Sequence, residues 1–540
     1  MSPTRRPARP VSVGAFRRAV VLVVLGLLVL VACGSDPDDL EVDRTEVRDG
    51  GTLQLAVGAL PTTFNRWAAP VGDTVDTVLE PTRGSAVMVA DDGSWSVDER
   101  YATSVDIAST EPFAVAVSLN PDAVWSDGSP IDVTDMQAFV AAQLALGGQT
   151  PADLERWSVV AAVVPGADAW SYTVQFTRPT ADWPALIYPG LPAEATAAEA
   201  YNGFADAAPP SNGPFVVSEI DRTEGAVRLE RNPQWWGETP ALEAIEFRAL
   251  DAQDQADAYA SGDLDAIELA PAGAEAVDGG VVSTSPGHEW SNLTLNAARG
   301  PLTSVAVRQA VALALDRPAL VEATSPDAEL AGSYVTVPGQ EGYADTVSDA
   351  LTRDPEQART LIASAGYTPT GDGWTSPDGA PLTLRLVVPE GNEPVATRAE
   401  AIQGDLADVG IEVAIEPRPV DTFFRDVVVP LDFDLVTFLW STDPLDTTAT
   451  VARVQPVDGP MNFTGLADPT VAQAASALLQ AVDPATFGSA AAAFDTAVLA
   501  TYVMIPLVVE PYVLAVGDDV VNLVARRFGV TDWAAVGFRA

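Results

Sequence analysis

Lysine is absent from this chain of 540 residues, and histidine and cysteine each occur once, as His288 and Cys33. Without lysine there can be no Walker A phosphate contact and no lysine Schiff base. A single histidine excludes His-rich metal sites, and a single cysteine excludes internal disulfides and thiolate zinc sites. We therefore expect no metal and no cofactor.

Positive charge is also scarce, because 29 arginines stand against 75 acidic residues and give a formal net charge of -46. No basic stripe offsets this charge, so nucleic acid is not an expected partner. The motifs G-x-S-x-G and H-E-x-x-H are missing, as is any glycine-rich phosphate loop. Carboxylate pairs occur by chance among so many acids and indicate no glycosidase. The sequence predicts a protein that is not an enzyme.

The N-terminus is first basic and then apolar. Five arginines and no acid occur in residues 1–18, and residues 19–32 (AVVLVVLGLLVLVA) carry no charge. This apolar run is shorter than the roughly 20 residues of a membrane-spanning helix and is typical of a secretory signal peptide over residues 1–32. The pair Arg17-Arg18 leaves both Sec and twin-arginine export open.

The signal peptide ends in Leu30-Val31-Ala32-Cys33, which resembles the lipobox of bacterial lipoproteins. The resemblance implies cleavage before Cys33, lipid attachment to its thiol and a location on the extracytoplasmic face of the cell membrane. The alternative is a free cysteine beside an uncleaved anchor. Cleavage would leave 24 basic against 75 acidic side chains, a net charge of -51. Residues 33–49 are polar and acidic and predict a flexible tether.

Patterns in the body of the chain predict a mixed α/β protein. Alternating apolar residues predict a strand at 51–57, and Asp132 is placed to cap a helix that runs through Leu146. Residues 382–388, 396–409 and 411–415 predict a strand, a helix and a strand. Such a βαβ unit indicates parallel strands in the C-terminal half.

Seven stretches in order resemble the family 5 extracytoplasmic solute-binding proteins, which serve ABC importers. They lie at 50–57 (GGTLQLAV), 125–139 (WSDGSPIDVTDMQAF), 211–220 (SNGPFVVSEI), 227–237 (VRLERNPQWWG), 294–317 (TLNAARGPLTSVAVRQAVALALDR), 354–367 (DPEQARTLIASAGY) and 399–417 (AEAIQGDLADVGIEVAIEP).

This resemblance implies an α/β fold of two lobes that is similar to the periplasmic binding proteins, with mixed sheets, an extra small domain and a ligand cleft between the lobes. Ligand would favour a closed form, which a membrane partner would recognise. The implied domains are I at 50–84, 209–297 and 508–540, II at 85–208, and III at 298–507.

The implied function is capture of an oligopeptide or other small molecule by a monomer, for delivery to ABC permease subunits. Residues 109–131 are most similar to an actinobacterial branch that includes a monoacyl phosphatidylinositol tetramannoside-binding lipoprotein, which is associated with control of envelope glycolipid synthesis. The alternative function is therefore a regulatory or scaffold lipoprotein that binds an envelope glycolipid or its biosynthetic enzymes.

Few residues are candidates for the ligand cleft. Phe64, Asn65 and Trp67 follow the first strand, where members of the family often line the pocket. Asp443 aligns with an acid that contacts the amino group of the ligand in peptide-binding members, since a buried ammonium needs a carboxylate. The alternative is that Asp443 caps the turn before Pro444.

Three further residues are weaker candidates for contact with ligand. Trp290 could stack on a sugar or a peptide side chain, or could pack in the core. Trp440 belongs to the segment 438–444 that, with Asp443, resembles the ligand-contacting segment of peptide-binding members. Asn462 is the third of these candidates.

Overall fold

The computed structural model describes residues 40–70, 72–147, 151–270, 279–324, 328–456, 459 and 461–540. These residues belong to one compact unit. The predicted signal peptide and lipidation site at Cys33 lie outside them. Within the described ranges, no helix is both long enough and apolar enough to cross a membrane.

The first lobe contains a four-stranded sheet with the order β2-β11-β10-β9. In β10, Val227 and Leu229 are buried, whereas Arg228 between them forms ion pairs with two glutamates. This alternation places the apolar face of the sheet on a core. The elements of this part are β2 (Thr52–Val57), α1 (Val75–Leu79), η3 (Glu80–Thr82), β9 (Phe215–Asp221), β10 (Ala226–Arg231), β11 (Ala244–Ala249), α5 (Ala252–Ser261) and β12 (Ala266–Leu269).

The predicted tether is shorter than expected, because the chain is folded from Leu40 onward. Leu40 is buried, and its carbonyl accepts a hydrogen bond of 2.7 Å from the backbone N–H of Asn522. After η2 (Arg44–Glu46), strand β1 (Val47–Arg48) pairs with β22 (Gly537–Arg539), which in turn pairs with β21 (Val520–Val521). The acidic composition of this segment gave no sign of these contacts, and their partners could not be predicted because they lie near the C-terminus of the chain.

A smaller part of the same lobe surrounds a second sheet, with the order β5-β6-β8-β7, and a short hairpin of β3 and β4. Its helix α2 starts at a capping box in which Asp132 accepts from the N–H of Thr134 (2.7 Å) and Asp135 accepts from the N–H of Asp132 (3.1 Å). The predicted helix from Asp132 through Leu146 is confirmed. The elements are β3 (Val87–Val89), β4 (Trp95–Val97), β5 (Ala102–Thr110), β6 (Phe113–Leu119), α2 (Val133–Leu146), α3 (Pro151–Ser158), β7 (Val160–Pro165), β8 (Ser171–Phe176), η4 (Trp183–Ala185), η5 (Ala193–Thr196) and α4 (Ala198–Tyr201).

The second lobe contains the predicted βαβ unit, formed by β17, α9 and β18. Strands β17 and β18 are parallel and in register from Thr383 opposite Glu412 to Pro389 opposite Arg418, so this prediction is confirmed. The helical and strand elements are η7 (Gly300–Thr303), α6 (Val305–Ala314), α7 (Arg317–Thr324), β14 (Glu329–Leu330), η8 (Asp349–Leu351), α8 (Pro355–Ser364), β15 (Thr368–Thr370), β16 (Gly373–Thr375), β17 (Thr383–Pro389), α9 (Glu393–Asp408), β18 (Glu412–Arg418), η9 (Val420–Thr422), the π-helix η10 (Phe424–Val428), β19 (Leu435–Ser441), α10 (Thr447–Ala452), α11 (Pro469–Leu479) and α12 (Pro484–Leu499).

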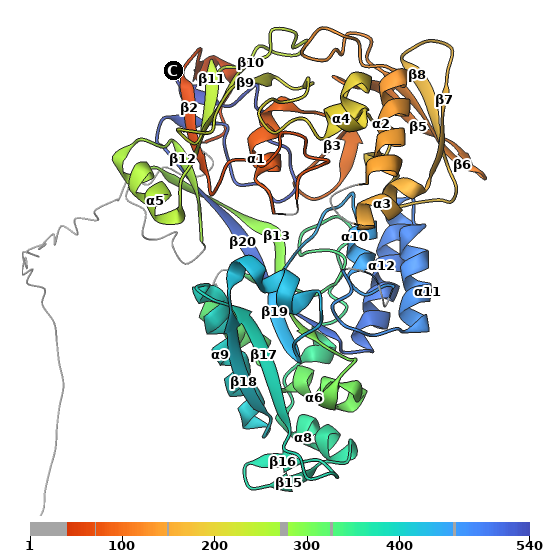
Figure 1. Cartoon of the computed structure of the whole chain (residues 1–540), viewed down its shortest axis with the longest axis vertical. Coiled ribbons are helices and arrows are strands. Elements are labelled where there is room, and N and C mark those ends of the chain that lie inside the picture. Colours follow the sequence, from red (N-terminus) through yellow and green to blue (C-terminus); the bar gives the residue numbers. More distant parts are fainter. Residues whose placement is uncertain are drawn as a thin grey trace, which may run out of the picture. The chain divides into compact units, whose positions relative to one another are not determined.

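Two long strands, β13 (Val281–Leu295) and β20 (Met504–Val516), connect the lobes and pair antiparallel along most of their length (Figure 1). They pair with β12 of the first lobe at one end and with β14 and β19 of the second lobe at the other. Their register shifts between Ser285 and Glu289. A shift of this kind bends a strand, so the crossover has an irregular point between the lobes.

Separate hydrophobic cores stabilise these parts. One surrounds Phe215 and Phe247 under the β2 sheet, a second surrounds Trp125 and Phe139 in the smaller part of the first lobe, and a third fills the second lobe. The mixed α/β architecture with two lobes agrees with the predicted fold class. The boundaries of domains I, II and III stay a prediction.

Candidate ligand-binding cavity

A cavity of about 780 Å³ lies mainly within the first lobe and is closed at one end by the second lobe. This volume is in the range of small-ligand sites. Its wall is assembled from the loop after β2, the α1–η3 segment, the turn after β4, helix α3, residues 185–191 and 208–217, and the C-terminal loop 528–533. The second lobe contributes Asp443, Leu445 and Asp446, which precede α10.

The first three predicted residues lie together in the wall of this cavity. Phe64 is fully buried in the core of the first lobe. Asn65 is buried too, and its side-chain amide donates to the carbonyl of Tyr201 (2.8 Å) and accepts from the N–H of Trp67 (3.1 Å). Trp67 packs edge-on against Phe139, with ring centroids 5.1 Å apart. Asn65 therefore holds the loop in shape, and Trp67 provides an aromatic part of the wall.

Asp443 also lines the cavity, on the side of the second lobe. Its Oδ1 accepts a hydrogen bond of 2.8 Å from the N–H of Leu445, so the residue caps a turn, as the alternative reading expected. It is also exposed, so the carboxylate is available to a ligand. Asp443 nevertheless lies among protein atoms at the end of the cavity, and their desolvation of its carboxylate, followed by the charge of Asp446, raises its pKa. Arg156 and Arg66 offset part of this increase.

The structure places Trp290, Trp440 and Asn462 away from the lining of this cavity. Trp290 is buried in the core of the second lobe and donates from its indole to Thr442 (3.3 Å). Trp440 stacks on Phe463, with ring centroids 5.8 Å apart and planes 5° apart. The amide of Asn462 donates to the carbonyls of Val454 (3.0 Å) and Pro456 (3.1 Å) and thereby braces its own loop.

The sequence reasoning missed four arginines in the wall, Arg66, Arg83, Arg100 and Arg156. Arg66 lies between Asn65 and Trp67, two residues that were predicted to line the pocket, so its place in the sequence already indicated that it could line the pocket too. Arg100 is held in a two-point contact by Asp98, with distances of 2.9 Å from Nε to Oδ1 and 2.7 Å from Nη2 to Oδ2. Such a forked pair fixes both side chains.

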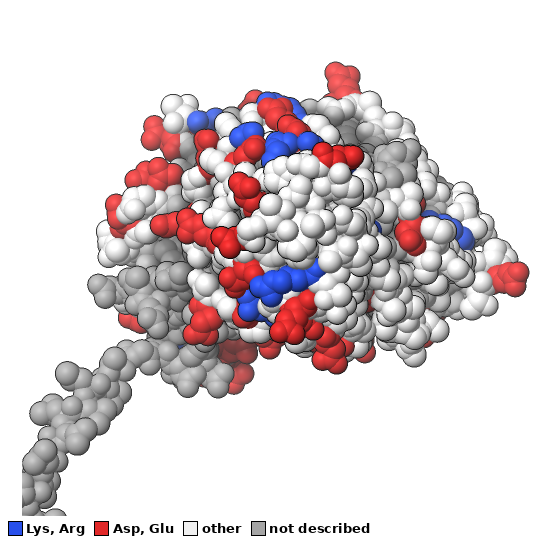
Figure 2. Space-filling model, turned by 90° about the horizontal axis from the view of Figure 1, so that it is seen from below, with Lys and Arg blue, Asp and Glu red and all other residues white. Residues whose placement is uncertain are grey.

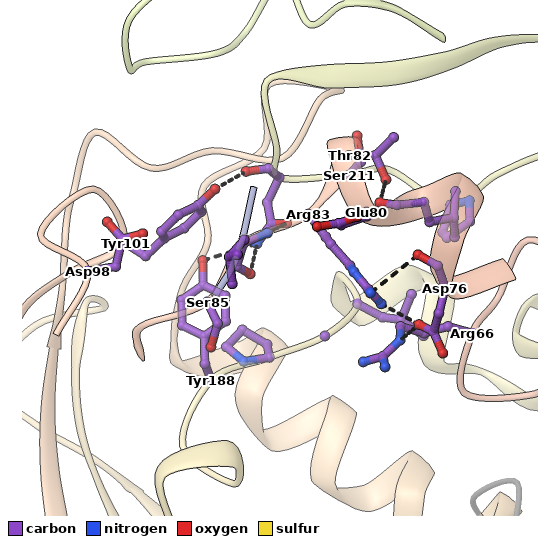
Figure 3. A pocket seen from close by; sticks show the side chains of 18 of the residues that line it. Arg66, Asp76, Glu80, Thr82, Arg83, Ser85, Asp98, Tyr101, Tyr188 and Ser211 are labelled. Carbon is purple, nitrogen blue, oxygen red and sulfur yellow. Dashed lines mark hydrogen bonds and ion pairs between the residues drawn. The ribbon is translucent and has the colours of Figure 1, made fainter. Parts of the chain in front are cut away.

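Arg66 and Arg83 converge on one carboxylate, that of Asp76 in α1. Nε of Arg66 lies 2.6 Å from Oδ1 of Asp76, and Nη1 of Arg83 donates to the same oxygen. Burial opposes the ionised form of Asp76, but the two guanidinium groups outweigh it and lower the pKa to about 2. Figure 3 shows these three side chains together on one side of the cavity, with Tyr101, Tyr188 and Asp98 on the other.

The two tyrosines in the wall of the cavity are hydrogen-bonded and neutral. Tyr101 donates from its hydroxyl to the carbonyl of Asn212 (3.0 Å), and the amide of Asn212 donates to the hydroxyl of Tyr188 (3.4 Å). Burial raises the pKa of both tyrosines above the usual value, so neither ionises at neutral pH. This side offers aromatic surface with a few polar atoms.

Contacts between the lobes adjoin the cavity. Asp182, next to η4 of the first lobe, is fully buried and accepts from the N–H of Thr447 (2.7 Å) and from the N–H (3.1 Å) and hydroxyl (2.5 Å) of Thr448 at the start of α10. Arg156 of α3 donates to the carbonyl of Leu445, and its Nη1 lies 3.4 Å from Asp446. We call the contacts of Asp182 and Arg156 with residues 445–448 the interlobe latch.

The cavity combines charged, polar and aromatic groups. Among the residues that the structure describes, no group of three histidine, cysteine or acidic side chains is placed to hold a metal ion. The only histidine, His288, packs near Phe528, with ring centroids 5.9 Å apart. The cavity instead presents charges of both signs beside aromatic surface, which suits recognition of a polar organic molecule.

Comparison with known proteins gives a consistent family match. The model of "Bacterial extracellular solute-binding proteins, family 5 Middle" matches residues 99–456. The oligopeptide-binding protein OppA of Mycobacterium tuberculosis H37Rv is 31% identical over 532 residues, covering 94% of this chain and 88% of the relative.

Two further similarities are informative. A solved structure of the periplasmic EDTA-binding protein EppA superposes with a TM-score of 0.82 and 25% identity, over 92% of this chain and 97% of that one. The probable monoacyl phosphatidylinositol tetramannoside-binding protein LpqW of M. tuberculosis H37Rv is 24% identical over 375 residues, which covers 62% of this chain and 58% of the relative.

Proposed function

Because the chain belongs to the family 5 bacterial extracellular solute-binding proteins, we propose that it captures a peptide-like ligand in the cavity and delivers it to an ABC permease. Members of this family bind peptides or other small ligands and work with ABC permeases. The main observation in support of the proposal is that residues of both lobes line the same cavity. A ligand there would contact both lobes at once and so favour their closed arrangement.

The charges at the end of the cavity formed by the second lobe support a ligand with an amino group. Asp443, Asp446 and Asp153 all line this region, with Arg156 among them and Arg66 close enough to Asp443 to lower its pKa. Acidic side chains thus outnumber basic ones there, and an ammonium group would offset the excess. An α-amino terminus of a short peptide has the required charge and size.

Replacement of Asp443 by asparagine tests this assignment. We expect Asp443→Asn to weaken binding of peptides with a free amino terminus by about tenfold or more, because one charge-assisted contact is lost. Binding of N-acetylated peptides should change little. Isothermal titration with both peptide forms measures the two effects. Equal losses for both forms would show that Asp443 acts only as the cap of its turn.

Closure itself is measurable in solution. With a saturating library of short peptides, we expect a smaller radius of gyration by small-angle X-ray scattering and a higher melting temperature, since ligand that binds only the closed form stabilises it. No change in either quantity across peptide, sugar and glycolipid libraries would contradict the transport function.

We further propose that the protein is anchored by lipid at Cys33 on the extracytoplasmic face of the cell membrane. The signal-peptide pattern and the lipobox support this proposal. Replacement of Cys33 by serine should move the protein from the membrane fraction to the soluble extracytoplasmic fraction. An unchanged membrane association would contradict the anchor.

The similarity to LpqW over 62% of this chain favours one alternative, a lipoprotein that binds an envelope glycolipid or its biosynthetic enzymes. Native mass spectrometry of the protein purified from its own envelope distinguishes the two functions. Co-purified peptides would support transport, whereas a co-purified glycolipid, together with recovery of a glycosyltransferase but no permease, would support the alternative.

A further inference from the structure

We propose that the hydroxyl of Tyr188 is a specificity-determining hydrogen-bond donor, which recognises a backbone carbonyl of the peptide ligand at the wall of the first lobe. This inference rests on the proposed function, because it assumes that the ligand occupies the cavity. It adds one directed polar contact and the chemical group that this contact selects, an uncharged oxygen acceptor.

The position of the Tyr188 oxygen is fixed by the packing of its ring. Tyr188 follows η4 and lines the cavity, with only 6% of its surface exposed. Its ring lies edge-on to that of Tyr101, with centroids 5.8 Å apart, and both rings belong to the same side of the cavity (Figure 3). Because a phenol oxygen lies on the axis of its ring, a packed ring holds this oxygen in one place while the hydroxyl proton can still rotate.

The side-chain amide of Asn212 decides which partner donates at this oxygen. Oδ1 of Asn212 accepts from the N–H of Gly84 (3.1 Å), and Nδ2 donates to the carbonyl of Gly84 (3.1 Å). The same Nδ2 donates to the Tyr188 hydroxyl (3.4 Å). Reversal of the amide would place donor against donor and acceptor against acceptor at Gly84. The Tyr188 oxygen is therefore the acceptor in its contact with Asn212.

The hydroxyl proton of Tyr188 is still available for a further hydrogen bond. A tyrosine hydroxyl carries one donor in addition to its acceptor sites. In the described part of the chain, the hydrogen bonding of the Tyr188 side chain is limited to the bond that it receives from Asn212. Two other buried tyrosines do donate within the protein, Tyr101 to the carbonyl of Asn212 (3.0 Å) and Tyr172 to that of Ile187 (2.6 Å). The acceptor for Tyr188 is thus expected from the contents of the cavity.

The charges near Tyr188 favour a neutral acceptor over an anionic one. Burial raises the pKa of the hydroxyl most, the bond from Asn212 offsets part of this increase, and the carboxylates of Asp135 and Asp98 raise the pKa further. Arg100 pairs with Asp98, whereas Asp135 accepts from three N–H groups and has no ion pair among the residues described. The hydroxyl therefore keeps its proton at neutral pH, and the charge of Asp135 opposes a carboxylate or phosphate beside it.

A peptide carbonyl has the properties that this donor requires. It is uncharged, it is a strong acceptor, and every residue of a peptide provides one. With its amino group at Asp443 of the second lobe and a carbonyl at Tyr188 of the first, a peptide would make a directed contact with each lobe. The two contacts together would favour the closed arrangement.

The experiment compares wild type with Tyr188→Phe, which removes the hydroxyl and keeps the ring. Competitive native mass spectrometry and titration calorimetry use a random tetrapeptide library and three libraries of the same composition, in which the first, second or third peptide carbonyl is a thiocarbonyl. Sulfur is larger than oxygen and accepts hydrogen bonds more weakly. The matched control is Tyr172→Phe, which also loses a buried hydroxyl but lies in a core outside the cavity lining. Melting temperatures confirm that each variant is folded.

We expect wild type and Tyr172→Phe to bind one of the three thiocarbonyl libraries about fivefold or more weakly than the unsubstituted library, as the loss of one hydrogen bond implies. Tyr188→Phe should bind the unsubstituted library about fivefold more weakly than wild type does. It should also discriminate between the libraries by less than about twofold. A purely structural role of Tyr188 would weaken all four libraries alike and leave the discrimination unchanged.

Three outcomes would overturn the assignment of Tyr188. Wild type that binds all four libraries equally would overturn it and leave the peptide function intact, and this result does not depend on the folding of any variant. Discrimination that persists in folded Tyr188→Phe would be due to the size of sulfur and would also overturn it. Failure of folded wild type to bind any library would overturn the assignment and the proposed function together.

Discussion

At the scale of single residues, burial decides which carboxyl groups of this acidic chain ionise readily. Asp495 is 1% exposed and accepts hydrogen bonds from the N–H of Tyr334 (2.9 Å) and the hydroxyl of Thr346 (2.7 Å). Burial outweighs these contacts and raises the pKa of Asp495 to about 6, from an ordinary value of 3.8. The folded protein therefore binds this proton more tightly than the unfolded chain does.

This shift predicts a contribution to stability that depends on pH. Because the folded pKa is raised, the contribution is fully present below about pH 3.8 and is lost as the pH rises through about 6. A pKa difference of this size corresponds to about 3 kcal/mol. Asp495→Asn should remove this dependence and flatten the curve of melting temperature against pH between those values. A variant curve parallel to that of wild type would contradict the prediction.

At the scale of elements, the interlobe latch depends on the start of α10. Asp182 satisfies two backbone N–H groups of that helix from the opposite lobe. Asp182→Ala leaves them buried without a partner, which costs about 1–3 kcal/mol each. We expect a lower melting temperature and a larger radius of gyration, because the lobes lose a contact that holds them together.

The matched control for the latch is Asp483→Ala. Asp483 caps α12 by accepting from the N–H of Thr486 (3.0 Å), within the second lobe. Its loss should cost about 1 kcal/mol and leave the radius of gyration unchanged. Expansion of both variants to the same extent would show that Asp182 has no special role between the lobes.

In the crossover strands, the backbone at position 287 requires glycine. This residue has φ +78° at the irregular point of β13, and an added Cβ would lie 2.0 Å from the carbonyl oxygen of Glu510 on β20. Gly287→Ala should destabilise the protein by about 2 kcal/mol or more. Gly58→Ala is the control, since nothing lies within 4 Å of its added Cβ. Denaturant unfolding measures both, and equal stabilities would contradict the expectation.

At the scale of the whole molecule, the excess of acidic side chains determines how the stability of the protein depends on salt concentration. On the face shown in Figure 2, acidic side chains are spread over the surface, and arginines lie beside them. A net charge of -46 makes the compact state repel itself, and salt screens this repulsion. We expect the melting temperature to rise as sodium chloride increases from about 20 mM to about 500 mM, because the Debye length shortens over this range and the repulsion between acidic side chains weakens. A fall would show that the local ion pairs outweigh the overall repulsion.

The predictions from sequence succeeded where the determinant is local. Asp132 and Asp135 lie close together in the chain and form a capping box, and the βαβ unit of β17, α9 and β18 follows from periodicity alone. The tether was predicted too long, because Leu40 and β1 pack on residues some 480 positions away. In the cavity, Trp67 and Asp443 line the wall, whereas Trp440 packs against Phe463.

The sequence by itself determined the N-terminal signal pattern, the mixed α/β class and the shortage of groups for cofactor chemistry, since each depends on composition or on short spacings. The resemblance to the family was also evident from seven stretches of the sequence between residues 50 and 417. Only the tertiary structure brought Arg66 and Arg83 onto Asp76, placed Asp443 of the other lobe at the same cavity, and buried Asp182 under α10. Contacts of this kind join segments that are remote in sequence, and the packing of whole elements decides them.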